Sequence, residues 1–246
     1  MKNSISRNAE FKGLEHRSNP PTGSVCLAVV ASFFVGILII SNIASSAKIV
    51  DLGISLFTIP LVFDGGTILF PLVYVLGDVI TEVYGFKITR RVIWTGFAAM
   101  ALTTGVFFLI GVMPGEALWA EETGGNDAYN AILGGMSYGG IVLASLAAYL
   151  AGEFSNAAIL SKLKVKTKGR FLWARTIGSS LIGQLLDTMI FVFIASLTGV
   201  FVWEIFWSLV ITNYILKVGI EVLVTPFTYG LSNFLKKKEG IDVFDL

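Results

Sequence analysis

Long apolar runs that carry almost no charge recur along most of this chain and constrain its fold more than any other feature. The first, VCLAVVASFFVGILIISNIASSA at 25–47, has no charged residue at all. Only 14% of the 246 residues are charged, whereas soluble domains have about 25%. Runs of about 20 apolar residues are long enough to cross a bilayer as helices. The pattern predicts an all-α integral membrane protein.

Six such runs can be distinguished by length and hydropathy. Residues 1–24 form a polar tail, 25–235 a membrane domain and 236–246 a second polar tail. Pro226 is expected to kink or end the last run. The predicted spans are 25–47, 66–84, 91–112, 138–160, 174–200 and 203–229.

Basic residues are distributed very unevenly between the connecting segments. The two tails and the loops after the second and fourth spans hold 16 of the 18 Lys and Arg residues. The positive-inside rule then places both termini in the cytoplasm of a multi-pass protein of the cell (inner) membrane. The basic segment KLKVKTKGR at 162–170 is predicted to be a cytoplasmic loop that contacts anionic lipid headgroups.

The segment DLGISLFTIPLVFDGG at 51–66 is too short and too interrupted to be a span. It is compatible with an extracytoplasmic loop, a short β-hairpin or a re-entrant segment. The sequence does not distinguish these three.

Several classes of chemistry lack their residues in this chain. His16 is the only histidine and Cys26 the only cysteine, so neither an imidazole relay nor a thiolate metal cluster is expected inside the membrane. No Walker A loop is present. Once the loops are accounted for, no basic face remains for nucleic acid. We expect no catalytic residue, metal or cofactor, and a transporter or its binding subunit rather than an enzyme.

Polar side chains recur at helical spacing within four of the predicted spans. An ion in the bilayer core is costly, so such residues usually face a shared interior. Structural roles are the alternative for some of these residues. Single amides and hydroxyls also serve as contacts between helices. Glu82 is close enough to Lys87 and Arg90 for an interfacial ion pair, and Lys217 and Glu221 could neutralise each other. The four stripes are Tyr74, Asp78 and Glu82; Tyr149, Glu153 and Asn156; Ser180, Gln184 and Asp187; and Asn213, Lys217 and Glu221.

Such an acidic interior suits a neutral or cationic ligand that is rich in hydrogen-bond donors. A carboxylate accepts two parallel N–H bonds, and a guanine-like edge presents that pair. Aromatic rings at Tyr74, Tyr149 and Phe191 are candidates for stacking on a base. This chemistry permits a nucleobase but does not select one over an amine or a vitamin.

Five motifs, in order, resemble those of the queuosine precursor transporter family, of the vitamin-uptake-transporter type. The N-terminal tail and the acidic loop 115–130 lie outside the resemblance. The motifs are SNI at 41–43, FPLVYVLGDVITEVYG at 70–85, GEFSN at 152–156, GQLLDTMIF at 183–191 and KVGIEVLVTPFTYG at 217–230.

The resemblance implies a six-helix importer of 7-deazaguanines such as preQ0, preQ1 or queuine for tRNA modification. By this resemblance, Asp187 or Glu153 would bind the guanine-like edge and Gln184 its carbonyl. Asp78 or Glu82 would meet an aminomethyl cation or carry a proton, and Lys217 would balance charge. Asp64 departs from the expected pattern, where an uncharged residue would precede the second span. The implied substrate-binding residues are Asn42, Asp78, Glu82, Glu153, Asn156, Gln184, Asp187 and Lys217.

Three functions remain open at this point. The favoured one is a stand-alone secondary transporter of a small purine-like substrate. The second is the substrate-binding subunit of an energy-coupling-factor importer, whose bundle also has six helices. The third is a structural protein whose polar stripes only join helices. The sequence also leaves a homo-oligomer open.

Overall fold

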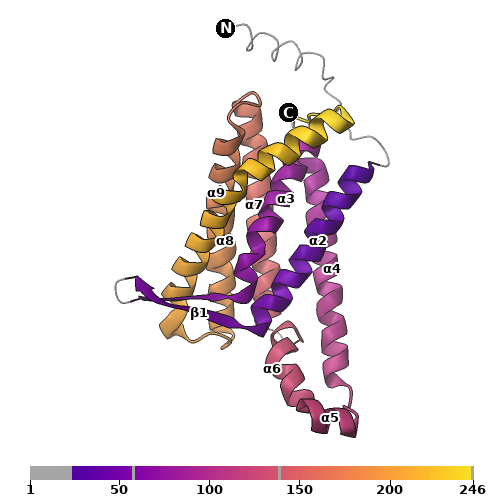
Figure 1. The fold of residues 1–246 in the computed structure, drawn as a ribbon, viewed down its shortest axis with the longest axis vertical. Helices are drawn as coiled ribbons and strands as arrows, with labels where there is room; N and C mark the ends of the chain where they lie inside the picture. Colours follow the sequence, from indigo (N-terminus) through magenta and orange to yellow (C-terminus); the bar gives the residue numbers. More distant parts are fainter. Residues whose placement is uncertain (1–23, 57–58, 138–139, 245–246) are drawn as a thin grey trace.

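The computed structural model describes residues 24–56, 59–137 and 140–244, so nearly all of the predicted N-terminal tail lies outside the described residues. The chain folds as a helical bundle with one β-hairpin (Figure 1). The longer helices are α2 (Val25–Ala47), α4 (Phe86–Val112), α7 (Gly140–Lys166), α8 (Leu172–Leu197) and α9 (Phe206–Glu239). The shorter elements are β1 (Ile49–Leu56), β2 (Ile59–Asp64), η1 (Gly65–Ile68), α3 (Phe70–Tyr84), α5 (Ala117–Thr123), α6 (Gly125–Ser137) and η2 (Trp203–Ile205).

Five of these helices, α2, α4, α7, α8 and α9, are long and apolar enough to cross a membrane. This confirms a multi-pass helical membrane protein but not the predicted count of six spans. The predicted span at 66–84 begins as the 3-10 turn η1 and becomes helical only at Phe70. Gly85, at φ 80°, ends it. At 1.5 Å per residue, the 15 residues of α3 fall well short of the hydrocarbon thickness.

Helix α3 lies inside the bundle instead of against lipid. It packs against α2, α4, α7 and α9, and 12 of its 15 residues are buried. Its apolar side chains join a core that includes Phe34, Leu38, Val79, Ile80 and Ile93. The polar residues of α3 are therefore surrounded by protein.

Helix α9 differs from its predicted form at its C-terminal half. Pro226 lies within it, and the helix continues to Glu239 rather than ending near 229. Proline is tolerated in membrane helices because neighbouring helices and side chains satisfy the freed carbonyl. The three lysines predicted to begin a tail, Lys236 to Lys238, form the last helical turn, where the helix dipole favours positive charge.

The segment predicted as a loop, hairpin or re-entrant piece is a two-stranded antiparallel hairpin. Ile49 pairs with Asp64 in its register. The hairpin crosses one end of the bundle beside α2 and α9 (Figure 1). Gly66 permits this approach, since a Cβ there would lie only 2.2 Å from the carbonyl oxygen of Ser41.

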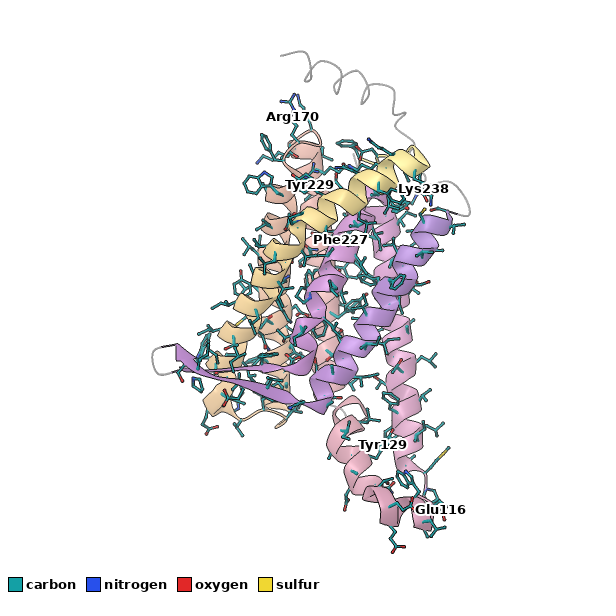
Figure 2. All side chains as sticks on the ribbon, in the orientation of Figure 1. Glu116, Tyr129, Arg170, Phe227, Tyr229 and Lys238 are labelled. Carbon is teal, nitrogen blue, oxygen red and sulfur yellow. The ribbon has the colours of Figure 1, made fainter. Side chains whose placement is uncertain are left out.

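The acidic loop after α4 forms the short helices α5 and α6, which extend beyond the bundle (Figure 1). The Glu116 carboxylate accepts a hydrogen bond from the Trp119 backbone N–H at 2.8 Å and caps α5. This bond lowers the pKa of Glu116. Glu116 lies at the opposite end of the molecule from Arg170 and Lys238 (Figure 2). Acidic and basic ends are thus separated, and the assignment of the basic end to the cytoplasm stays a prediction.

Candidate functional site

Members of all four predicted polar stripes meet where α3, α7, α8 and α9 pack together, whereas Glu82, Tyr149 and Asn213 have partners elsewhere. Two glycines bring α7 and α8 unusually close. A Cβ on Gly183 would lie 3.0 Å from the Gly152 carbonyl oxygen and 2.8 Å from the Asn156 Cβ. A Cβ on Gly152 would lie 2.4 Å from the Tyr74 hydroxyl. The close approach is therefore made at Gly183, whereas a Cβ on Gly178 would meet only an ordinary contact at 3.9 Å.

Asp78 of α3 is joined to α7 and α8 by a chain of hydrogen bonds. The Asn156 amide donates to the Asp78 carboxylate at 2.7 Å. The Ser180 hydroxyl in turn donates to the Asn156 carbonyl oxygen at 3.3 Å. Three of the four predicted stripes therefore meet through direct side-chain contacts.

Lys217 of α9 forms an ion pair with Asp187 of α8, with 2.7 Å between Nζ and Oδ2. Its ammonium group also lies 4.7 Å from the centre of the Phe70 ring. Glu221 instead accepts a hydrogen bond from the Gln184 amide. The alternative in which Lys217 and Glu221 neutralise each other is wrong, because both side chains reach across to α8.

Several buried polar atoms beside these pairs have no hydrogen-bond partner among the described residues. They are the Tyr74 hydroxyl, both carboxyl oxygens of Glu153, Gln184 Oε1 and Glu221 Oε1. Each of these side chains is at most 5% exposed. Buried polar groups are normally satisfied, so the concentration of such atoms at one place makes it the candidate site.

We call this group of side chains the central cluster. It holds four carboxyl groups and one ammonium group, and all of its members are buried. Tyr74 lies within electrostatic range of all four carboxyls. The cluster is therefore acidic and closed in the conformation described. Its members are Tyr74, Asp78, Glu153, Asn156, Ser180, Gln184, Asp187, Lys217 and Glu221.

Glu82 lies one turn from Asp78 but belongs to a different set of contacts, which we call the terminal network. Its carboxylate is 2.6 Å from Lys236 Nζ and 2.9 Å from Arg175 Nη2. Lys87 and Arg90 were the partners considered from the sequence. Lys87 and Arg90 are near Glu82 in the sequence, but the packing of the helices places Lys236 and Arg175 within ion-pair distance of it. The terminal network comprises Glu82, Lys164, Arg175, Lys236 and Asp242.

The terminal network also holds the segment after α9 against the bundle. Asp242 is 2.6 Å from Lys164 Nζ, and the Val243 N–H donates to the Val83 carbonyl at 3.3 Å. Ile241 is fully buried. Lys164 was predicted in a loop that contacts lipid headgroups, and for this residue that prediction is wrong, because α7 extends to Lys166 and the Lys164 side chain is buried. Arg175 of α8 is buried as well.

Three further predicted site residues have other partners. The Asn42 amide donates to the Leu38 carbonyl within α2. The Tyr149 hydroxyl donates to the Ile93 carbonyl of α4 at 2.8 Å. Phe191 packs edge-on against Phe201, in an apolar core between α7, α8 and α9. The structure does not join these side chains to the central cluster by a direct contact.

Asp64, which departs from the resemblance, is the centre of a third polar group, the hairpin knot. The Asp64 carboxylate accepts bonds from the Ser45 hydroxyl, the Gly66 N–H, the Thr67 hydroxyl and the Asn213 amide. The sequence analysis missed this knot. Its signal is Asp64 followed by GGT, because an aspartate commonly caps the helical turn that it precedes.

Metal chemistry is not suggested by the geometry. Within the part of the chain that the structure describes, no group of three or more His, Cys, Asp or Glu side chains is arranged to hold a metal ion.

The fold and the site together define a multi-pass helical membrane protein with a buried acidic cluster. The family model described as "Putative vitamin uptake transporter" matches residues 64–231 of the chain. This protein therefore belongs to that family of transporters, and the matched region contains every member of the central cluster.

Two relatives are named more specifically. The chain is 26% identical over 175 residues to the "Probable queuosine precursor transporter" of Bacillus subtilis strain 168, covering 71% of this chain and 73% of that protein. It is 25% identical over 211 residues to the "Queuosine precursor transporter" of Escherichia coli K12, covering 85% and 89%. These names confirm the family resemblance seen in the motifs and do not support the energy-coupling-factor alternative. No solved structure matches the chain.

Proposed function

We propose that this protein is a secondary transporter that imports 7-deazaguanine precursors of queuosine across the cell (inner) membrane, and that the central cluster binds the base. The observation that carries this proposal is the set of buried polar atoms of the central cluster that lack partners among the described residues. A bound purine-like molecule would supply donors and acceptors to those of Tyr74, Gln184 and Glu221, and Glu153 is assigned no base contact. The names of the two relatives support the choice of substrate class.

The proposed contacts follow from the hydrogen-bonding pattern of a guanine-like base. Its ring N–H and exocyclic amino group suit a carboxylate, which Asp187 supplies while Lys217 balances its charge. The base carbonyl suits the amide of Gln184 or Asn156. Tyr74, between α7 and α8, is placed to contact the ring. Asn42, Glu82, Tyr149 and Phe191 are not assigned base contacts, because the contacts described for them lie outside the central cluster.

Transport also requires that the cluster become accessible. Its side chains are almost fully buried, so the described conformation is closed to both surfaces. In secondary transporters, a central site is exposed alternately by movement of helix groups around it. Glycine contacts hold α7 and α8 together as one unit, so we expect α3 or α9 to move against them.

The test is uptake of labelled preQ0, preQ1 and queuine by proteoliposomes that contain only this chain. We expect saturable uptake that Asp187→Asn abolishes. The matched control is Thr103→Val on α4, whose hydroxyl bonds the Ala99 carbonyl of its own helix and which should transport normally. Binding in detergent without uptake would instead indicate a subunit that needs partners. Absence of both binding and uptake would refute the proposal.

A further inference from the structure

Glu153 of α7 differs from every other acid in the central cluster. Asp78 accepts from Asn156, Asp187 pairs with Lys217, and Glu221 accepts from Gln184. Neither oxygen of Glu153 has a hydrogen-bond partner within the described ranges. The side chain is 1% exposed. It is thus the acid of the cluster to which the described structure gives no donor.

The surroundings of Glu153 are narrow and partly apolar. Its Oε2 would lie 3.0 Å from a Cβ at Gly77 of α3, so the carboxyl group is held in the seam between α3 and α7. The Phe34 ring of α2 lies beside the same point, 3.6 Å from that Cβ position. Glycine at 77 is what leaves room for the carboxyl group.

The charged and titratable groups around Glu153 are mainly acids. Helix α3 presents Tyr74 and Asp78, and Tyr149 lies one turn away on α7. Helix α8 presents Asp187, and α9 presents Glu221 together with Lys217, whose charge is paired with Asp187. From α2 the uncharged Phe34 ring faces the same point. An ionised Glu153 would therefore be repelled by its neighbours.

The closed conformation consequently fits only one protonation form of Glu153. An ionised carboxylate without a donor is very costly to bury, whereas a neutral carboxylic acid is far less so. The closed bundle accommodates the neutral acid. A carboxylate at this position would instead require water, and hence a cluster open to one surface.

We infer that Glu153 carries the proton that is co-transported with the substrate, an inference that rests on the proposed function. The proton binds a Glu153 carboxyl oxygen from water while the cluster is open on one side. The neutral side chain allows the bundle to close around the substrate. When the cluster opens on the other side, water solvates the carboxylate and the proton leaves. One proton crosses with each substrate, and no other bond forms or breaks.

The test uses proteoliposomes and labelled preQ0, because this base is uncharged and brings no ionic group of its own. For one proton per substrate, a gradient of one pH unit supports about tenfold accumulation. Glu153→Gln mimics the neutral acid. We expect it to lose accumulation driven by a proton gradient, while counterflow exchange, which needs no net movement of protons, stays measurable. Asp187→Asn should lose binding and exchange as well.

A second measurement needs no variant. With a pH indicator inside the vesicles, addition of preQ0 to wild-type protein should acidify the lumen as substrate enters. Saturable uptake that ignores the proton gradient and moves no protons would overturn this inference and leave the proposed function standing. Gradient-driven accumulation by Glu153→Gln would also overturn it. Wild-type protein that neither binds nor transports a 7-deazaguanine would overturn both.

Discussion

Asp64 and Glu153 are both buried carboxyl groups in this bundle, yet their surroundings are opposite. Asp64 accepts hydrogen bonds from four donors of α2, η1 and α9. Glu153 has a donor for neither oxygen among the residues described. A carboxylate whose oxygens are all satisfied holds structure together, whereas one left without donors is retained at a cost in stability. For these two acids, the number of donors separates a structural role from the proposed proton-carrying one.

The terminal network should show the largest structural effect, because it concentrates charge. Glu82→Gln would leave the buried Lys164 and Arg175 and the partly buried Lys236 around one remaining acid, Asp242. Removing one partner of a buried ion pair costs about 3–5 kcal/mol. We expect a large fall in the thermal stability of detergent-solubilised protein, measured by size-exclusion chromatography after heating. Unchanged stability would contradict a structural role for Glu82.

The two contrasting acids can be compared directly with amide variants. Asp64→Asn replaces an acceptor by a donor that faces other donors, and should destabilise by about 1–3 kcal/mol without weakening preQ0 binding at matched folded protein. Glu153→Gln keeps the shape of the neutral acid and should leave thermal stability unchanged or raised. A loss of stability in Glu153→Gln as large as in Asp64→Asn would remove the distinction drawn between them.

The contact between α7 and α8 can be tested at two glycines of the same helix. Gly183→Ala places a methyl group 3.0 Å from the Gly152 carbonyl oxygen, and overpacking of this kind costs about 1–3 kcal/mol. Gly178→Ala is the matched control, since its nearest neighbour would be 3.9 Å away. Thermal unfolding should separate the two variants, and equal stability would show that the close approach is not rigid.

The smallest effects are expected from two tyrosine hydroxyls. Tyr149→Phe removes a bond to the Ile93 carbonyl and should cost about 1 kcal/mol of stability with normal binding. Tyr74→Phe removes a hydroxyl that lacks a described partner. It should leave stability unchanged and weaken preQ0 binding about two- to tenfold, the worth of one neutral hydrogen bond. Equilibrium binding in detergent measures this, and the reverse pattern would exclude Tyr74 from the site.

Periodicity within single helices made much of this site predictable from the sequence. A carboxylate within an apolar run must face protein, so Asp78, Glu153 and Asp187 were found from their positions alone. Which acid pairs with which cation depends on how the helices pack against each other. For this reason the links of Lys217 to Asp187, and of Glu82 to Lys236 and Arg175, could not be derived from spacing along one helix.

The fold was predictable where length alone decides the outcome. Helices α2, α4, α7, α8 and α9 follow from apolar runs long enough to span a membrane. Helix α3 and the hairpin do not follow in this way. Gly65 and Gly66 lie close to α2, and Gly85 makes the turn that ends α3. Both features depend on how the elements pack in three dimensions. The continuation of α9 past Pro226 likewise depends on its neighbours.

The enclosure of α3 has a consequence for how the chain is made. With 15 residues and two acids, α3 is a poor candidate for insertion into the bilayer by itself, because an aspartate at the centre of a helix opposes insertion by about 2.5–3.5 kcal/mol. Two of the helices that enclose it, α7 and α9, are synthesised later. The topology of the first half therefore becomes final only after the second half has been translated. In a nascent chain arrested before α7, a cysteine introduced into α3 should be accessible to water-soluble thiol reagents, because α3 has no cysteine of its own.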